Sequence, residues 1–232
     1  MGIVRPVKRK GDPDISEAIM VIPKPVLSYV KRFNVKEFGE IESCLYNLYL
    51  IENIAICGPF FGAPHAAVGL EKLICLGAKK IWVLSWCGSI SQDARIGDII
   101  LPTGAFSDEG TSAHYPISCS PSPDSFMLSA LREKLKKMNL KFKEGILWTT
   151  DAPYRETEEK IRYYQKKGAI GVDMEICALM TVAIFRSASL ASAFVVSDEI
   201  FDMRWKRGFS DRKLKDSSKK LLNILVELAK GV

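Results

Sequence analysis

The sequence has little of what metal-binding, secreted or membrane proteins require. It contains two histidines and six cysteines, and the cysteines form no CxxC pair and have no histidine close by, which excludes the spacing of zinc and thioredoxin-like sites. Most cysteines lie in apolar runs, where we expect small core residues; the six are Cys44, Cys57, Cys75, Cys87, Cys119 and Cys177. No apolar run approaches the length of a membrane span, and Asp12, Asp14 and Glu17 precede the first one, unlike a signal peptide. We therefore expect a cytoplasmic protein without a metal or organic cofactor and without membrane contact.

An excess of negative charge is also lacking, since 33 Lys and Arg stand against 27 Asp and Glu, a net charge of +6. The basic excess lies in residues 5–10 and 204–220. Such a distribution suits nucleic acid or an anionic small molecule. However, no aromatic stripe interleaves with the basic residues, and Asp211, Asp216 and Glu227 alternate with them. This pattern favours solvated helix faces, and we expect no nucleic-acid binding.

The sequence has no internal repeat and no evident linker, so we expect one domain over residues 1–232. With 47% hydrophobic residues it can bury a substantial core. Short apolar runs alternate with longer helical patterns, which is typical of an α/β protein with a largely buried sheet. The expected strands are 18–22, 51–57, 80–85, 98–105, 144–150 and 192–198. The expected helices are 25–33, 64–77, 124–138, 156–167, 175–188 and 211–230.

Polar residues follow several expected strands, at the sheet edge where ligands of α/β proteins bind. In "SWCGSI", Gly88 permits close approach of the backbone to a ligand, although a simple turn explains the same residues. In "AFVVSDEI", Ser197 and Asp198 follow an apolar run. A carboxylate there must be hydrogen-bonded, exposed at a cleft or protonated, because burying an unpaired charge is costly. A binding site and a turn account for Asp198 equally well.

Two further carboxylates, Asp173 and Glu175, stand in the apolar stretch "GVDMEICALM" where a helix is expected to begin. Asp is a favoured N-cap and Glu is favoured in a first turn, because both meet unpaired N–H groups and the positive end of the helix dipole. For this helix start alone, capping is the favoured interpretation. A binding site is the alternative.

Taken together and in order, "GAIGVDMEICAL", "AFVVSDEI" and the upstream "VLSWCGSISQDARIGDIILP" resemble the nucleoside phosphorylase-I family over about residues 50–200. This family includes purine nucleoside phosphorylases, uridine phosphorylases and nucleosidases. The resemblance implies a three-layer α/β/α fold with a central mixed sheet, of the phosphorylase/hydrolase-like type. It also implies cleavage of the N-glycosidic bond of a purine or pyrimidine nucleoside with phosphate, giving the free base and ribose 1-phosphate.

The resemblance assigns roles to individual residues of this chain. Glu175 falls on the glutamate that binds the ribose hydroxyls, and Met174 on the methionine that packs against the sugar. Asp198 falls on the aspartate that contacts a purine base and assists its departure, so Glu175 and Asp198 are the expected catalytic pair. The remaining expected substrate contacts are Gly88, Ser197 and Tyr154, with Tyr154 stacking on the base unless it is a core residue.

The phosphate site departs from the family pattern. The "GDPxR"-like loop is replaced by "VIPKPVL", and Val83 stands near the position of the expected arginine. Because phosphate is bound by Arg, hydroxyls and N–H groups, the expected ligands are Ser89, Thr111, Ser112, Thr150 and Arg155. Surface pairing with Glu156 or Glu158 is the alternative for Arg155. Further candidates, which the sequence does not rank, are Lys24, Arg32 and Arg95. His114 is a candidate ligand-facing donor, and a structural role, the commoner one for a lone histidine, is its alternative.

Three functions therefore stay open: a phosphorylase as the leading hypothesis, a hydrolytic nucleosidase, and a non-catalytic nucleoside sensor. The Gln and Arg that mark uracil recognition in uridine phosphorylases are absent, since Thr157 and Glu159 occupy their positions. This leaves the base open, with Asp198 favouring a purine. The resemblance also implies a homo-oligomer, a trimer or hexamer with a dimer as the alternative, in which a neighbouring subunit completes the site.

Overall fold

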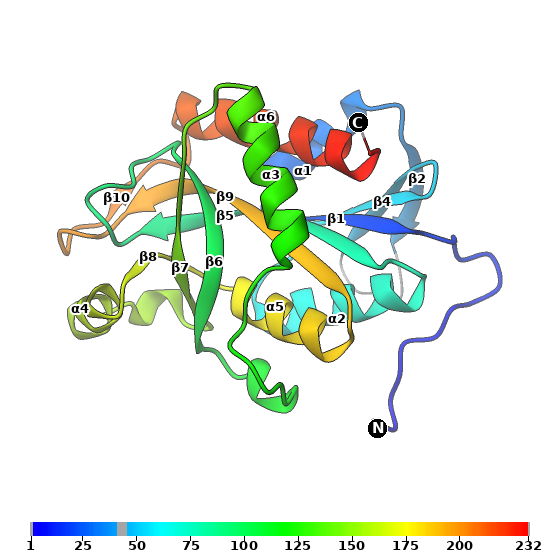
Figure 1. The fold of residues 1–232 in the computed structure, drawn as a ribbon, viewed down its shortest axis with the longest axis horizontal. Helices are drawn as coiled ribbons and strands as arrows, with labels where there is room; N and C mark the ends of the chain where they lie inside the picture. The colour runs from blue at the N-terminus through cyan, green and yellow to red at the C-terminus, as the bar shows by residue number, and fades with distance from the viewer. Residues whose placement is uncertain (1, 41–45, 232) are drawn as a thin grey trace.

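The alternating apolar strands and helices form a mixed sheet between two helical layers in the computed structural model (Figure 1), which describes residues 2–40 and 46–231. Cys44 and its expected core position lie outside this part of the chain. The strands are β1 (Glu17–Val21), β2 (Lys36–Glu40), β3 (Asn47–Ile51), β4 (Ile54–Gly58), β5 (Lys80–Ser89), β6 (Ile99–Asp108), β7 (Phe142–Thr150), β8 (Ala169–Asp173), β9 (Ser189–Glu199) and β10 (Lys206–Arg207). The helices are α1 (Lys24–Leu27), α2 (Ala63–Cys75), α3 (Ser125–Lys137), α4 (Glu158–Lys166), α5 (Ile176–Phe185) and α6 (Arg212–Ala229), with 3₁₀ turns η1 (Ser28–Arg32), η2 (Ser112–His114) and η3 (Pro153–Arg155).

The sheet curls on itself. The strand order in the described residues is β10-β9-β6-β7-β8-β5-β1-β4-β3-β2, and β9 also pairs with β5. The circuit β9-β6-β7-β8-β5 therefore closes into a partial barrel. The pairings β1–β4, β1–β5, β5–β9, β6–β7 and β7–β8 are parallel, whereas β5–β8 and β6–β9 are antiparallel. The expected mixed α/β fold is thus confirmed.

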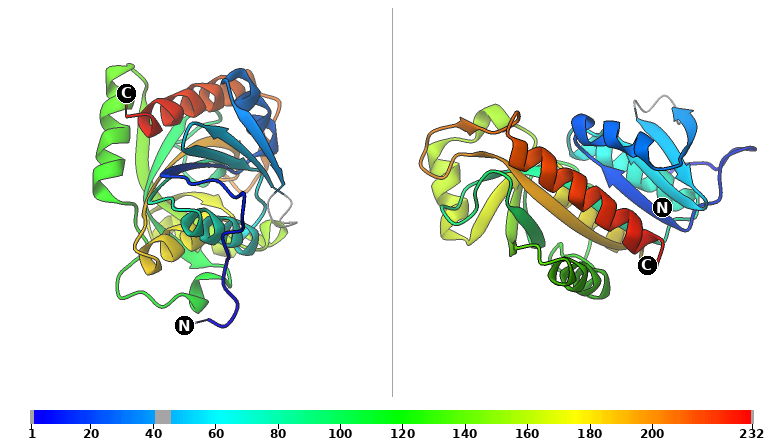
Figure 2. Two further views of the ribbon diagram at one scale, coloured as in Figure 1. Left: turned by 90° about the vertical axis from the view of Figure 1, so that its right-hand side faces the viewer. Right: turned by 90° about the horizontal axis from the view of Figure 1, so that it is seen from above.

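Helices cover both faces of this sheet. α2 and α5 pack together on one face, while α1, α3 and α6 lie on the other, with α6 crossing the sheet as seen from above in Figure 2. α5 is apolar on all sides because it lies between the sheet and α2, and its residues 176–183 are all buried. α6 instead buries one stripe that includes Leu214, Leu221 and Leu225 against the sheet. The three-layer prediction holds.

All the expected strands and helices form within a few residues of their predicted bounds, except that 25–33 divides into α1 and the 3₁₀ turn η1. Four strands, β2, β3, β8 and β10, were not predicted. β8 is short, contains Gly171 and leads directly into α5, and β10 has two exposed basic residues, so neither shows strand periodicity. Within the described residues, no helix is long and apolar enough to span a bilayer, and no cluster of His, Cys, Asp or Glu could hold a metal ion.

Candidate active site

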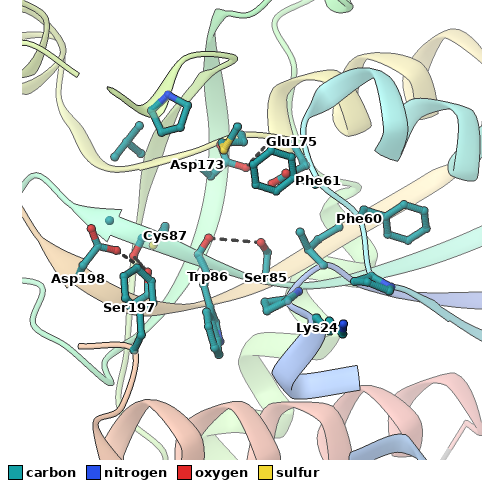
Figure 3. A pocket seen from close by; sticks show the side chains of 18 of the residues that line it. Lys24, Phe60, Phe61, Ser85, Trp86, Cys87, Asp173, Glu175, Ser197 and Asp198 are labelled. Carbon is teal, nitrogen blue, oxygen red and sulfur yellow. Dashed lines mark hydrogen bonds between the residues drawn. The ribbon is translucent and has the colours of Figure 1, made fainter. Parts of the chain in front are cut away.

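A pocket of about 940 Å³ opens where the carboxyl ends of β1, β4, β5, β8 and β9 meet. The parallel pairings of β4, β1, β5 and β9 bring the carboxyl ends of these four strands to one edge of the sheet, and β8 meets β5 there through an antiparallel pairing. Figure 3 shows Asp198, Ser197 and Cys87 on one side of the view and Asp173, Glu175 and Phe61 on another. The pocket therefore lies where the strand-end polar residues predicted a binding site, at the carboxyl ends of the strands.

Glu175 and Asp173 divide two tasks at the start of α5. Asp173 caps the helix, because its Oδ2 accepts hydrogen bonds from the N–H groups of Glu175 at 3.0 Å and Ile176 at 2.7 Å. Its Oδ1 accepts a hydrogen bond from the Thr149 hydroxyl at 2.6 Å. Glu175 makes no cap; its Oε1 accepts a hydrogen bond from the Gly62 N–H at 2.7 Å, and its side chain lines the pocket. Capping therefore explains Asp173 and not Glu175.

Burial raises the pKa of both carboxyl groups of this pair. For Glu175 the negative charge of Asp173 adds to burial, which raises the pKa further, and the Gly62 N–H opposes the increase. For Asp173 the hydrogen bonds from Thr149, Glu175 and Ile176 oppose the effect of burial. Because burial makes the ionised form of Glu175 costly, a ligand that donates hydrogen bonds to it stabilises the site. The cis-hydroxyls of a ribose are donors of this kind.

Asp198 lies at the end of β9, with both carboxyl oxygens hydrogen-bonded. The Ser197 hydroxyl donates to Oδ1 at 2.6 Å, and the Trp205 indole N–H donates to Oδ2 at 2.8 Å. Gly88, whose strand β5 pairs with β9 here, makes room for this carboxyl, since a Cβ at position 88 would lie 3.3 Å from Oδ2. Asp198 is therefore held at the pocket wall and not at a simple turn.

A third carboxyl group, Glu156, lines the pocket beside Asp198 and was not singled out by the sequence pattern as a site residue. Burial, together with the negative charge of Asp198, raises its pKa to about 7. Burial, together with the negative charges of Asp173 and Asp198, raises the pKa of the nearby Cys87 thiol, which disfavours a thiolate there. Carboxyl groups are thus prominent among the titratable side chains that line the pocket.

The six expected substrate contacts all line this pocket. Met174, Glu175, Gly88, Ser197 and Asp198 lie on its walls, and Tyr154 stands at the rim with 94% of its surface exposed. This exposure excludes the core interpretation of Tyr154. The arrangement brings residues from β5, β8, β9 and the loop after β7 to one place, as the order of motifs predicted.

The five expected phosphate ligands are not among the lining residues. The Ser89 hydroxyl donates to the Ser91 carbonyl at 2.8 Å, and the Thr150 hydroxyl accepts from the Ala152 N–H at 3.3 Å. The backbones of Thr111 and Ser112 are bound by the Glu109 carboxylate. Arg155 is exposed and is paired with neither Glu156 nor Glu158, since Glu158 pairs with Arg162 at 2.6 Å. Phosphate binding by these five residues stays a prediction, and their positions outside the pocket lining do not support it.

Several residues that line the pocket were not among the site residues expected from the sequence motifs. Among the described lining residues Lys24 is the single Lys or Arg, and His65 is a further nitrogen donor or acceptor whose Nδ1 accepts from the Phe61 N–H at 3.3 Å. Lys24 was one of the unranked candidates for binding phosphate. The aromatic lining residues, which no spacing marked in advance, are Phe60, Phe61, Trp86, Trp205 and Phe209.

The fold and the carboxyl-lined pocket define an α/β protein with a pocket at the carboxyl ends of its strands. Residues 26–230 match the model of the phosphorylase superfamily, and the chain belongs to this family. Among its relatives, the guanosine phosphorylase of Halorubrum lacusprofundi is 25% identical over 72% of this chain and 70% of its own. A DeoD-type purine nucleoside phosphorylase of Buchnera aphidicola is 26% identical over 93% of both chains.

Solved structures share the fold at lower identity. Uridine phosphorylase from Vibrio fischeri superposes with a TM-score of 0.81 at 20% identity, covering 99% of this chain and 98% of its own. Purine nucleoside phosphorylase from Toxoplasma gondii, in complex with immucillin-H, superposes with a TM-score of 0.82 at 19% identity, covering 99% of this chain and 96% of its own. AMP nucleosidase from Bacteroides thetaiotaomicron superposes with a TM-score of 0.73 at 23% identity, covering 94% of this chain and 91% of its own. At these identities the likeness establishes the fold alone, and the fold does not select the base.

Proposed function

We propose that this protein cleaves the N-glycosidic bond of a nucleoside, with phosphate as the acceptor of the sugar. The observation that carries the proposal is that Glu175 and Asp198 line one pocket of about 940 Å³, a volume sufficient for a sugar joined to a base. Family membership supports the reaction class, and the two relatives named above are phosphorylases of guanosine and of purine nucleosides.

The residues fit the charge changes of this reaction. As the bond from C1′ to the base nitrogen breaks, its electron pair moves to the base and the ribose becomes oxocarbenium-like. Glu175, accepting from the 2′- and 3′-hydroxyls, stabilises this cationic sugar more than the neutral substrate. Asp198 serves as the general acid that passes a proton to the departing base, a contribution of about 10²–10⁴-fold for such groups. A phosphate oxygen attacks C1′, which yields ribose 1-phosphate.

The base end favours a purine. Asp198 meets an imidazole nitrogen such as N7 only in a purine, and Glu156 beside it offers a second carboxyl for N–H groups of the base edge. Trp205, which donates to Asp198, supplies aromatic surface at this end, and Tyr154 adds aromatic surface at the rim of the pocket. A pyrimidine uses fewer of these groups, so purine nucleosides are the proposed substrates.

Hydrolysis is the second candidate, and the lining of the pocket favours it. Phosphate sites use Arg, Lys and N–H donors, whereas the described lining residues include Lys24 and no arginine. If phosphate binds in this pocket, Lys24 and the hydroxyl of Ser85 are its proposed ligands, with further donors from a neighbouring subunit of a homo-oligomer. Water replaces phosphate in the alternative.

One activity panel tests these proposals. Purified protein is given inosine, guanosine, adenosine, uridine and methylthioadenosine, each with and without phosphate, and base release is measured for the wild type and for Glu175→Ala and Asp198→Ala. We expect phosphate-dependent release from a purine nucleoside, with kcat/KM lowered about 100-fold or more in both variants. Wild-type kcat/KM in Glu175→Ala would refute the sugar-binding role.

The phosphate dependence separates the candidates. Equal rates without phosphate indicate hydrolysis, and tight binding without turnover indicates a sensor. For phosphorolysis, Lys24→Met should raise the KM for phosphate. Lys31→Met, a matched change in the adjacent turn η1, where Lys31 pairs with Glu37 at 3.5 Å, should leave it unchanged.

A further inference from the structure

Trp205 differs from the other three tryptophans of the chain in where its indole N–H is used. Trp82 donates to Glu17 at 3.0 Å, Trp86 to Ser218 at 2.9 Å and Trp148 to Asp108 at 3.1 Å. Trp205 donates to Asp198, inside the pocket, while 56% of its surface stays exposed. An exposed indole contributes little to folding, so the hydrogen bond to Asp198 is its most specific interaction.

The β9–β10 hairpin places Trp205 for this contact. Lys206 pairs with Glu199 and Arg207 with Asp198, so Trp205 follows in register opposite Ile200. The intervening turn has Met203 at φ 64° and closes with the Met203 N–H donating to the Ile200 carbonyl at 3.0 Å. After the hairpin, the Gly208 N–H donates to the Ser197 carbonyl at 2.9 Å, which fixes the second strand. Backbone pairing thus places Trp205 opposite Ile200, two residues along β9 from Asp198, and its indole reaches diagonally to the Asp198 carboxyl group.

Neighbouring side chains hold the ring in this orientation. The Arg207 guanidinium lies over the Trp205 ring, 5.2 Å from its centroid, and Phe209 meets it edge to face at 6.4 Å. Cation–π and T-shaped aromatic contacts each stabilise a defined ring orientation. Trp205 and Phe209 both line the pocket. The hairpin therefore contributes an aromatic wall as well as the hydrogen bond.

The two oxygens of Asp198 are then restrained from opposite sides, Oδ1 by the Ser197 hydroxyl and Oδ2 by Trp205. The Ser197 hydroxyl is shared, since it also lies 3.1 Å from the Cys87 carbonyl. The direction of the Trp205 N–H is fixed by the indole ring, whereas the hydroxyl hydrogen of Ser197 can rotate. Trp205 therefore restrains the plane of the Asp198 carboxyl group more strictly than Ser197 does. The orientation of a general acid toward its acceptor decides how well it transfers a proton.

We propose that Trp205 is a positioning residue for Asp198: its indole N–H orients the carboxyl group toward the leaving base, and its ring closes the base end of the pocket. This inference rests on the proposed cleavage of a nucleoside. Trp205 contacts the acid and not the bond that breaks, so its effect passes through Asp198.

The test compares Trp205→Phe, which keeps an aromatic ring and removes the N–H, with Trp82→Phe, which makes the same change at an indole–carboxylate pair on β5 away from the pocket. We expect kcat for inosine to fall about 10- to 100-fold in Trp205→Phe, with KM changed less than threefold. Trp82→Phe should keep the wild-type kcat in the folded protein. Trp205→Ala, which also removes the ring, should raise KM in addition.

Two further readouts separate positioning from a merely structural role. In an Asp198→Ala background, Trp205→Phe should have no additional effect on kcat. With 4-nitrophenyl riboside, whose leaving group departs without a proton, Trp205→Phe should retain the wild-type rate. Additive losses in the double variant, or an equal loss with the nitrophenyl substrate, would overturn the inference. An unchanged kcat in Trp205→Phe would overturn it while the proposed function stands, and base release by no form of the protein would overturn both.

Discussion

The carboxyl group of Glu156 faces the pocket with no hydrogen bond or ion pair to the described residues. Burial and the negative charge of Asp198 raise its pKa from 4.5 to about 7. A group in this state binds a proton more tightly in the folded chain than in the unfolded one. Its ionisation therefore opposes folding: the cost is absent below the unfolded pKa, grows as the pH rises between 4.5 and about 7, and is fully present above that range.

We predict that Glu156→Gln stabilises the protein above the folded pKa and leaves its stability unchanged below the unfolded one. The expected gain is about 1–2 kcal/mol, because solvent screens part of the interaction at this partly exposed side chain. Thermal unfolding at a series of pH values measures it. The control is Glu159→Gln, an exposed carboxylate of α4. A gain of equal size at every pH would show that the charge of Glu156 is not its cause.

At the scale of elements, the start of α5 is tied to the end of β7 through one threonine. The Thr149 hydroxyl donates to Asp173 Oδ1 at 2.6 Å and accepts from the Cys177 N–H at 3.0 Å. Asp173 in turn caps the helix, and Met174 and Glu175 lie between these two anchors. The geometry of the proposed sugar site is therefore set by the junction of β7, β8 and α5.

Thr149→Val should lower the free energy of unfolding by about 1–3 kcal/mol, because it leaves a buried N–H and a buried carboxylate each without one partner. It should also lower kcat/KM. Thr181→Val is the matched control in α5, the helix that Thr149 anchors: its hydroxyl donates to the Cys177 carbonyl at 2.8 Å, and that carbonyl keeps its helical hydrogen bond. We expect this control to change stability by less than about 0.5 kcal/mol. Chemical denaturation measures both, and equal losses would contradict the role of Thr149 as an anchor.

This junction also shows which part of the site the sequence could predict. The expected side-chain capping by Asp173 at "GVDMEI" is present, although Glu175 and not Asp173 occupies the N-cap position of α5, and Glu175 and Asp198 line one pocket. β8 was not predicted, because a five-residue strand with a central glycine that enters a helix has no clear period of two. Local pattern thus predicts elements that pack by their own periodicity and misses those fixed by neighbouring strands.

At the scale of the whole molecule, the pocket draws on residues from Ile22 to Phe209, which the folded sheet brings to one edge. Trp205 and Glu156 were not predicted for this reason, since Trp205 depends on the pairing of β10 with β9 and Glu156 on the loop after β7.

The extended N-terminal segment lies along the outside of the molecule (Figure 2). Buried Lys72 of α2 holds it through the Val7 carbonyl and Asp12, at 2.5 and 2.9 Å. The segment and the pocket are separate features of the fold.

A ligand that bridges the sugar and base ends should stabilise the molecule as a whole, because it joins β5, β8 and β9 in the folded state alone. We predict that a purine-like C-nucleoside, in which a carbon–carbon bond replaces the cleavable one, raises the unfolding free energy by about 2.7 kcal/mol at one hundred times its Kd. Differential scanning calorimetry measures this. Under phosphorolysis, added phosphate should increase the effect, whereas a hydrolase should show no such increase.

The increase on adding the C-nucleoside should be lost in Glu175→Ala. It should persist in Glu71→Ala, a matched change on α2, where Glu71 is paired with Arg186 at 2.7 Å away from the pocket. Glu71→Ala lowers the starting stability because it breaks that ion pair, but it removes no contact to the ligand, so the ligand-induced difference is the quantity to compare. If Glu175→Ala kept the full increase, the carboxyl group at position 175 would not bind the sugar, whatever the protein does with its substrate.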